Sequence, residues 1–219
     1  RSRAQHRPRA RHVNHATDAD DREPGERRAN VRDRAQRVEA QLDLGARVQS
    51  AHTDPAEAHA APSDYFVDLT AHPDHFFVRG PRIGTDQLLL LDALTGYWPD
   101  AGAAGLGRMR GRKKVDPGAW YFKAHFFQDP VQPGSLGVDA LVQLLECFCI
   151  ERGLADGMAA PRFQSPAIGV EQRWKYRGQV QPTSKEVQAD IEVTRVEREA
   201  GSVLVVAEAS LWVDRSEEH

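Results

Sequence analysis

Two side chains that can transfer protons lie on either side of a Pro-Gly turn. His125 is in an aromatic stretch, WYFKAHFF, and Asp139 lies near the start of a long apolar segment. The turn that ends at Gly134 folds the chain back between them, so a base and an acid could face each other across a cleft lined by Phe126 and Phe127. A site shielded from water in this way favours general acid–base catalysis.

Each of these residues also has a structural interpretation. A single histidine among aromatic residues is more often a hydrogen-bonded structural residue than a catalyst. Asp139 would lie in the first turn of a helix, where the helix dipole stabilises a carboxylate. Gln143 follows one turn later on the same face, either as part of a site or as a buried amide with satisfied hydrogen bonds. The residues alone leave both alternatives open.

The segment after the turn predicts a helix that is buried nearly all round. From Val138 onward almost no polar face remains; the apolar positions are Leu141, Val142, Leu144, Leu145, Phe148, Cys149 and Ile150. The preceding prolines and glycines exclude regular helix before about Leu136. A basic last turn and a glycine, Arg152-Gly153, predict its end. Such a helix is usually wrapped by other elements.

Alternating apolar residues predict a sheet that could wrap this helix. Period-two patterns occur in 168–176, 187–193 and 203–213, as in an antiparallel sheet with one dry face. Upstream, 88–97 is a continuous apolar run that predicts a buried strand, and 105–115 is its expected antiparallel partner. One helix cannot cover the edges of such a sheet, so we expect two units to pair. The predicted fold class is therefore α+β.

Two shorter segments precede this unit. Residues 65–69 and 76–78 have the composition of short strands interrupted by Pro73. They predict an extra edge or a segment wrapped over the core.

The segment HFFQDPVQPGSLGVDALVQL closely resembles the active-site segment of the FabA-type β-hydroxyacyl-acyl-carrier-protein dehydratases. Every fixed position of that family's string, H-F-x-x-D-P-V-x-P-G-x-L-G-x-D-x-x-x-Q, is present. The resemblance covers roughly residues 85–214, and Gln132 and Ser135 make it closest to dehydratase domains of polyunsaturated fatty acid and iterative polyketide synthases. It implies the hotdog fold, a curved antiparallel sheet around one long central helix.

The resemblance also implies a role for each residue. His125 would exchange the α-proton of a β-hydroxyacyl thioester, Asp139 would handle the departing β-hydroxyl group, and Gln143 would help to orient it. The backbone N–H of Gly134 would polarise the thioester carbonyl, which explains the lack of a side chain there. The products would be a trans-2-enoyl thioester and water. The family uses no metal or organic cofactor.

The resemblance further implies two partners. An acyl carrier protein would present the substrate on its phosphopantetheine arm. A second hotdog, in a homodimer or in the same polypeptide, would complete the site, since in this family the His and Asp of one site come from different hotdogs. A basic cluster, defined as Arg108, Arg110, Arg112, Lys113 and Lys114, is either a solvated strand face or a landing site for the acidic carrier.

Two other functions compete with dehydration. A catalytically silent hotdog, kept as a structural partner in a megasynthase, would be favoured if His125 or Asp139 were missing, and both are present. A hotdog acyl thioesterase ranks third, because thioesterases of this fold typically use a carboxylate without this histidine context.

The composition sets the remaining expectations. Residues 1–60 are rich in Arg and Ala, contain no aromatic residue and predict a low-complexity linker, extended or disordered, before a hotdog domain at 64–214. Within it, the apolar spacing of 31–48 allows a short helix or a transient docking segment. A net charge of −3 argues against nucleic acid, and no apolar run is long enough for a membrane span. Cys147 and Cys149 cannot pair on one helix, which favours a reducing cytoplasm.

Overall fold

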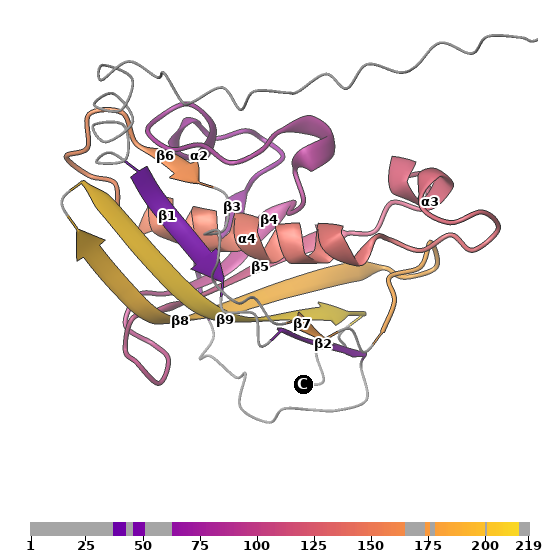
Figure 1. Cartoon of the computed structure of the whole chain (residues 1–219). Helices are drawn as coiled ribbons and strands as arrows, with labels where there is room; N and C mark the ends of the chain where they lie inside the picture. Colours follow the sequence, from indigo (N-terminus) through magenta and orange to yellow (C-terminus); the bar gives the residue numbers. More distant parts are fainter. Residues whose placement is uncertain are drawn as a thin grey trace, which may run out of the picture.

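A curved sheet wraps around one long helix, α4 (Gly134–Glu151), in the computed structural model (Figure 1). The structure describes residues 63–164, 174–175, 178–199 and 201–214, and the backbone of 37–42 and 46–50. The strands in these residues are β1 (Arg37–Leu42), β2 (Ala46–Ser50), β3 (Val67–Asp68), β4 (Ala93–Trp98), β5 (Arg108–Lys114), β6 (Arg162–Gln164), β7 (Trp174–Lys175), β8 (Glu186–Glu199) and β9 (Ser202–Val213). The shorter helical elements are α2 (Asp74–Phe77), η1 (Asp86–Leu88) and α3 (Trp120–Ala124).

The centre of the sheet is antiparallel. Strands β4, β5, β8 and β9 pair in that order, and the full order is β3-β4-β5-β8-β9-β1-β6. In β8 the buried side chains alternate as predicted, at Val187, Ala189, Ile191 and Val193, until the register shifts between Val193 and Arg195. The predicted strands at 187–193 and 203–213, and the pairing of 105–115 with the strand before it, are confirmed.

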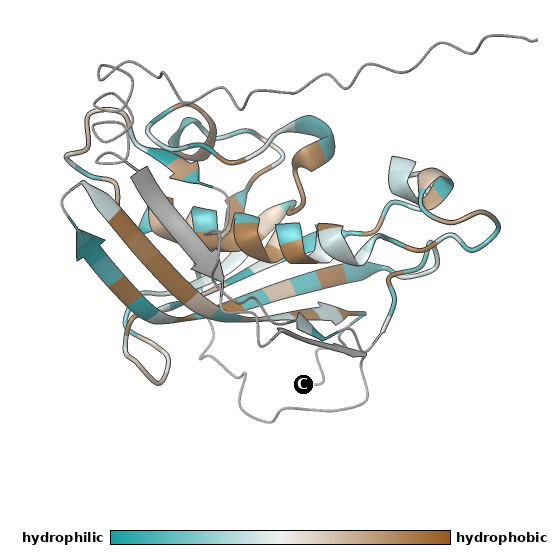
Figure 2. Cartoon of the chain, in the orientation of Figure 1, coloured by the Kyte–Doolittle hydropathy of each residue, from teal (hydrophilic) through white to brown (hydrophobic). Residues whose placement is uncertain are grey.

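Helix α4 is the core of the fold. Ten of its residues are buried, and Figure 2 shows apolar residues recurring along both α4 and β9. The helix begins at Gly134, earlier than predicted, because Pro133 lies at the N-cap with ψ 131°, where its missing N–H costs no helical hydrogen bond.

The end of α4 is confirmed. Gly153 has a φ of +63°, its N–H donates to the carbonyl of Ile150, and the N–H of Leu154 donates to that of Cys149. This is a Schellman motif, which requires the left-handed conformation that glycine adopts without strain.

Two local predictions in the N-terminal half of this unit are corrected. The run 88–97 is not one strand: η1 occupies its start and β4 begins only at Ala93, because backbone groups between them bond to a side chain of α4. Residues 74–77 form α2, not a strand, since Pro73 takes the N-cap position with Asp74 in the first turn. The first short strand is confirmed as β3.

The N-terminal strands differ from the linker prediction. β1 and β2 both pair with β9 in parallel, so the helix predicted within 31–48 is wrong there. The segment RVEAQL of β1 also alternates apolar and polar residues, as a strand does. As a strand it pairs with the edge of β9 that would otherwise have no partner. Of the strand predicted at 168–176, Trp174–Lys175 forms β7, and the rest lies outside the described residues.

No helix in the part of the chain that the structure describes is long and apolar enough to cross a bilayer.

Candidate active site

His125 is fixed in one orientation by the loop that it begins. It follows the last residue of α3, and its backbone N–H donates to the carbonyl of Tyr121. The half-buried imidazole has Nδ1 3.1 Å from the carbonyl oxygen of Val131. Because a carbonyl oxygen only accepts hydrogen bonds, this contact places a proton on Nδ1. In the neutral ring the lone pair of Nε2 is then available to take a proton from another molecule.

Gly134 is the first residue of α4, directly after Pro133 at the N-cap, and no side chain caps this end. The N–H groups of the first turn of a helix have no acceptor within the helix, and they lie at the positive end of its dipole. The backbone N–H at Gly134 is therefore free of a helical partner and can donate to an acceptor outside the helix.

Asp139 lies in the second turn of α4 and not in the first turn as predicted, because the helix begins already at Gly134. Its side chain is exposed in the single chain, yet neighbouring atoms withdraw it from water enough to raise the pKa of the carboxyl. A carboxyl with a raised pKa holds its proton more readily and is a better general acid near neutral pH.

The predicted cleft between these residues is not formed within one chain. Phe126 and Phe127 are 56% and 92% exposed, so they line no cleft, and Phe126 instead lies against the His125 ring with centroids 4.0 Å apart. Among the described residues, no hydrogen bond or ion pair joins His125 to Asp139. Figure 1 shows the reason: α3 and the loop after it project beyond the end of α4.

Gln143 is a buried amide that holds the segment before β4 onto the helix. Its side chain is 4% exposed. Oε1 accepts hydrogen bonds from the N–H groups of Leu90 (2.8 Å) and Leu91 (3.2 Å), and Nε2 donates to the carbonyl of Leu88 (3.0 Å). The structural interpretation of this residue is thus present in the structure. One N–H of Nε2 remains for the predicted role in orienting a substrate hydroxyl.

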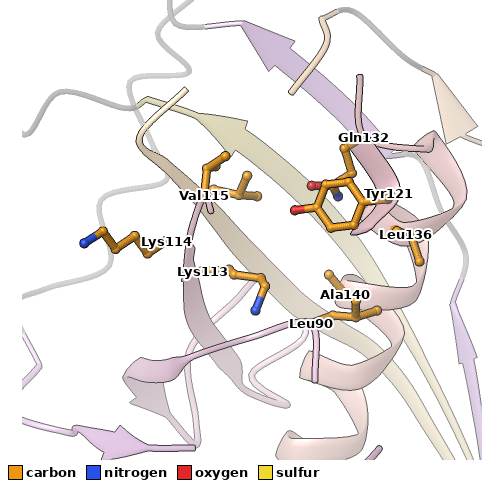
Figure 3. Close-up of a pocket in the computed structure, with 9 residues that line it drawn as sticks. Leu90, Lys113, Lys114, Val115, Tyr121, Gln132, Leu136 and Ala140 are labelled. Atoms are coloured by element: carbon orange, nitrogen blue, oxygen red, sulfur yellow. The ribbon is translucent and has the colours of Figure 1, made fainter. Parts of the chain in front are cut away.

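A small cavity of ≈ 20 Å³ lies beneath α3 (Figure 3). Tyr121 and Gln132 cover it on one side, Leu136 and Ala140 of α4 form another wall, and Lys113 extends toward it from β5. Burial, and then the nearby carboxylates, raises the pKa of the Tyr121 hydroxyl. Neither His125 nor Asp139 lines this cavity, so it is not itself the reaction site. It is a small gap between α3 and α4.

Glu146 is a candidate that the sequence analysis missed. It lies seven residues after Asp139, nearly on the same helical face, and burial followed by the charge of Asp139 raises its pKa to about 7. One signal could have revealed it. A second acidic residue interrupts the apolar pattern of α4 on the face that already carries Asp139.

Most of the basic cluster is paired with acidic residues. The partners are Arg108 with Glu192 (3.6 Å), Arg110 with Asp190 (2.7 Å), Arg112 with Glu186 (3.7 Å) and Lys113 with Asp92 (3.0 Å). These contacts favour the interpretation as a strand face. The exposed Lys114 extends from the end of β5.

Within the described residues, no group of three or more His, Cys, Asp or Glu side chains gathers as the ligands of a metal ion would.

Comparison with known proteins places this geometry in a family. Residues 83–217 match the model of the FabA-like domain. A stretch of 116 residues, 52% of the chain, is 41% identical to a polyunsaturated fatty acid synthase subunit from Thraustochytrium sp. (strain ATCC 26185 / S-3). That stretch spans only 8% of the relative's length. The resemblance found in the sequence is therefore confirmed: the chain belongs to the FabA-like domain family, with the hotdog fold.

Proposed function

We propose that the chain dehydrates a β-hydroxyacyl thioester carried by an acyl carrier protein during fatty acid or polyketide synthesis. The observation that carries this proposal is the contact between His125 Nδ1 and the carbonyl oxygen of Val131, which leaves the lone pair of Nε2 available as a base. Membership of the FabA-like family supports the same reaction class.

The proposed reaction has one proton removed and one supplied. Nε2 of His125 takes the α-proton, while the N–H at Gly134 stabilises the negative charge that develops on the thioester oxygen. The carboxyl of Asp139 donates a proton to the β-hydroxyl group, which leaves as water, and its raised pKa favours this acid role. The free N–H of Gln143 can orient the hydroxyl. The trans-2-enoyl thioester remains, and no metal or organic cofactor takes part.

We further propose that two hotdogs form the working unit. Asp139 and the aromatic side chains beside His125 are exposed in the single chain, and apolar groups left in water favour association. A second hotdog, either a copy of this chain or a neighbouring domain, would cover Phe126 and Phe127. His125 of one unit would then act with an Asp from the other unit.

Two substitutions test the assignment. In a β-hydroxyacyl N-acetylcysteamine thioester assay followed by mass spectrometry, His125→Ala and Asp139→Asn should each lower the dehydration rate about 10²- to 10⁴-fold, with unchanged circular dichroism. The exposed Asp156→Asn is a matched control that should keep the wild-type rate. Wild-type rates in either active-site variant would refute the roles, and release of free acid would identify a thioesterase instead. A folded, paired wild-type chain that leaves the substrate unchanged would identify a silent partner.

Mixing the two inactive variants tests the paired site in a homodimer. Random exchange makes half of the dimers mixed, and one of the two sites in each mixed dimer keeps both residues. Activity should therefore return to roughly a quarter of the wild-type value, since only intact sites stabilise the transition state. No recovery after verified exchange would contradict a site shared between two copies of this chain.

A further inference from the structure

Glu146 is a half-buried carboxyl that the proposed reaction does not use. It lies about 10 Å along α4 from Asp139, at 1.5 Å per residue, on nearly the same face. Among the described residues, it has no hydrogen-bond or ion-pair partner. Withdrawing a carboxylate from water without a partner is costly, so its position favours a role toward something that enters the site.

An open groove of ≈ 500 Å³ lies over this part of α4. Val142 and Glu146 belong to the helix, while the segments 80–82 and 161–164 form the walls, the second including β6, which lies beside α4 in Figure 1. Phe163 adds an apolar surface. The groove therefore lies further along the face of α4 that carries Asp139.

We propose that this groove receives the distal part of the substrate's acyl chain and that Glu146 is a specificity-determining residue, which disfavours long saturated chains when it is ionised. The inference rests on the proposed function, because it places the β-carbon at Asp139. A methylene chain laid over a carboxylate removes the water that solvates it and offers no hydrogen bond in return.

The length of chain that reaches Glu146 follows from the helix geometry. Carbon–carbon bonds of roughly 1.5 Å advance an extended chain by about 1.3 Å each, so about 10 Å corresponds to about eight carbons beyond the β-carbon. An eight-carbon acyl group ends before Glu146, and a sixteen-carbon group must pass it.

The protonation state of Glu146 can change in the neutral range, because burial and the charge of Asp139 raise its pKa to about 7. The charged groups around it are Asp139 on its own helix and Arg82 and Arg162 on the groove walls. The thiols of Cys147 and Cys149 beside it are buried, with raised pKa values. Below pH 7 the carboxyl is mainly neutral and tolerates a hydrocarbon chain. Above pH 7 it is mainly ionised.

Calorimetric binding of saturated acyl-pantetheine thioesters tests the inference in the full chain. With a pKa of about 7, the neutral fraction of Glu146 falls about tenfold between pH 6 and pH 8, so affinity for the sixteen-carbon thioester should fall about tenfold. Affinity for the eight-carbon thioester should stay constant. Glu146→Gln should remove the pH dependence for the long chain, while Glu208→Gln, an exposed glutamate of β9, should retain it.

A long-chain affinity with the same pH profile as the short-chain affinity would overturn the inference, as would an unchanged profile in Glu146→Gln. Because the saturated thioesters cannot lose water, the result is separate from the proposed reaction. Loss of dehydration with intact pH-dependent binding would refute only the dehydratase. Normal dehydration with pH-independent long-chain binding would refute only the role of Glu146.

Discussion

Replacing Gln143 with leucine should destabilise the fold strongly, although the two side chains are similar in size. The change removes the acceptor Oε1 and the donor Nε2, which together hold the segment before β4. The N–H groups of Leu90 and Leu91 and the carbonyl of Leu88 lose their partners. Leu90 and Leu91 are buried, so water does not reach their N–H groups without movement of the segment.

The expected magnitude follows from these three groups. An unsatisfied buried polar group costs about 1 to 3 kcal/mol, and the Leu88 carbonyl, at the exposed end, can turn to water. Two orphaned N–H groups therefore give a loss of about 3 kcal/mol in the free energy of unfolding. With a urea slope of about 1 to 3 kcal/mol per M, the unfolding midpoint should fall by about 1 to 3 M.

Urea unfolding followed by tryptophan fluorescence measures this loss. Gln181→Leu is the control, since Gln181 is exposed and its hydrogen bonds among the described residues are made by the backbone: its N–H donates to the Ser184 hydroxyl, and its carbonyl accepts from the Ser184 N–H. It should shift the midpoint little. A loss below about 1 kcal/mol for Gln143→Leu, the net worth of one ordinary hydrogen bond, would refute the idea that this amide fastens the segment.

Three other predictions concern stability and accessibility. Gly107→Ala should lower the free energy of unfolding in urea by about 3 kcal/mol, because φ is +119° and a Cβ would lie 2.7 Å from Phe148. Gly157→Ala, a control with positive φ but open space around it, should lower it by about 1 kcal/mol. Equal losses would refute the packing argument. Cys147 and Cys149, both buried, should react with a thiol reagent only after denaturation; rapid labelling of the native chain would contradict their burial. For Glu146 the folded pKa of about 7 exceeds the ordinary 4.5, so its stabilising contribution is full below pH 4.5 and is lost as the pH rises through 7. Relative to Glu146→Gln, the wild-type free energy of unfolding should then fall by about 2 to 3 kcal/mol between pH 4.5 and pH 8, and parallel pH profiles would refute the burial of this carboxyl.

Local patterns were sufficient for the central elements of the fold. The many apolar residues of α4 predict a buried helix, and the alternation in β8 and β9 predicts strands with one buried face. The sequence alone therefore predicts the helix, the strands and the contact between them. The end of α4 was equally predictable, because Gly153 is required by a hydrogen-bonding motif of only a few residues.

Features set by distant contacts could not be predicted in this way. The strand at 88–97 was predicted too long, because the side chain of Gln143, more than fifty residues away, binds the backbone that a strand would have used. The cleft predicted beside Phe126 is not formed within one chain, because the loop after α3 projects beyond α4. One of its contacts, between His125 Nδ1 and the Val131 carbonyl, cannot be read from a local pattern. The short strands β1 and β2 form by pairing with β9. The apolar residues of this segment fit a helical as well as a strand periodicity, so the local pattern did not decide between the two.

The acidic partners of the arginines on β5 bear on how this strand finds β8. Arg108 and Arg110 stand directly opposite Glu192 and Asp190 in the ladder, and Arg112, opposite Gln188, pairs with Glu186 two residues further along β8. The paired residues of the two strands are some eighty positions apart in the chain. A slip of one residue would turn three guanidinium groups toward the apolar helix. A slip of two would leave a cation and an anion unmatched at the ends. The outer surface thus encodes the correct alignment of two strands that no short turn connects.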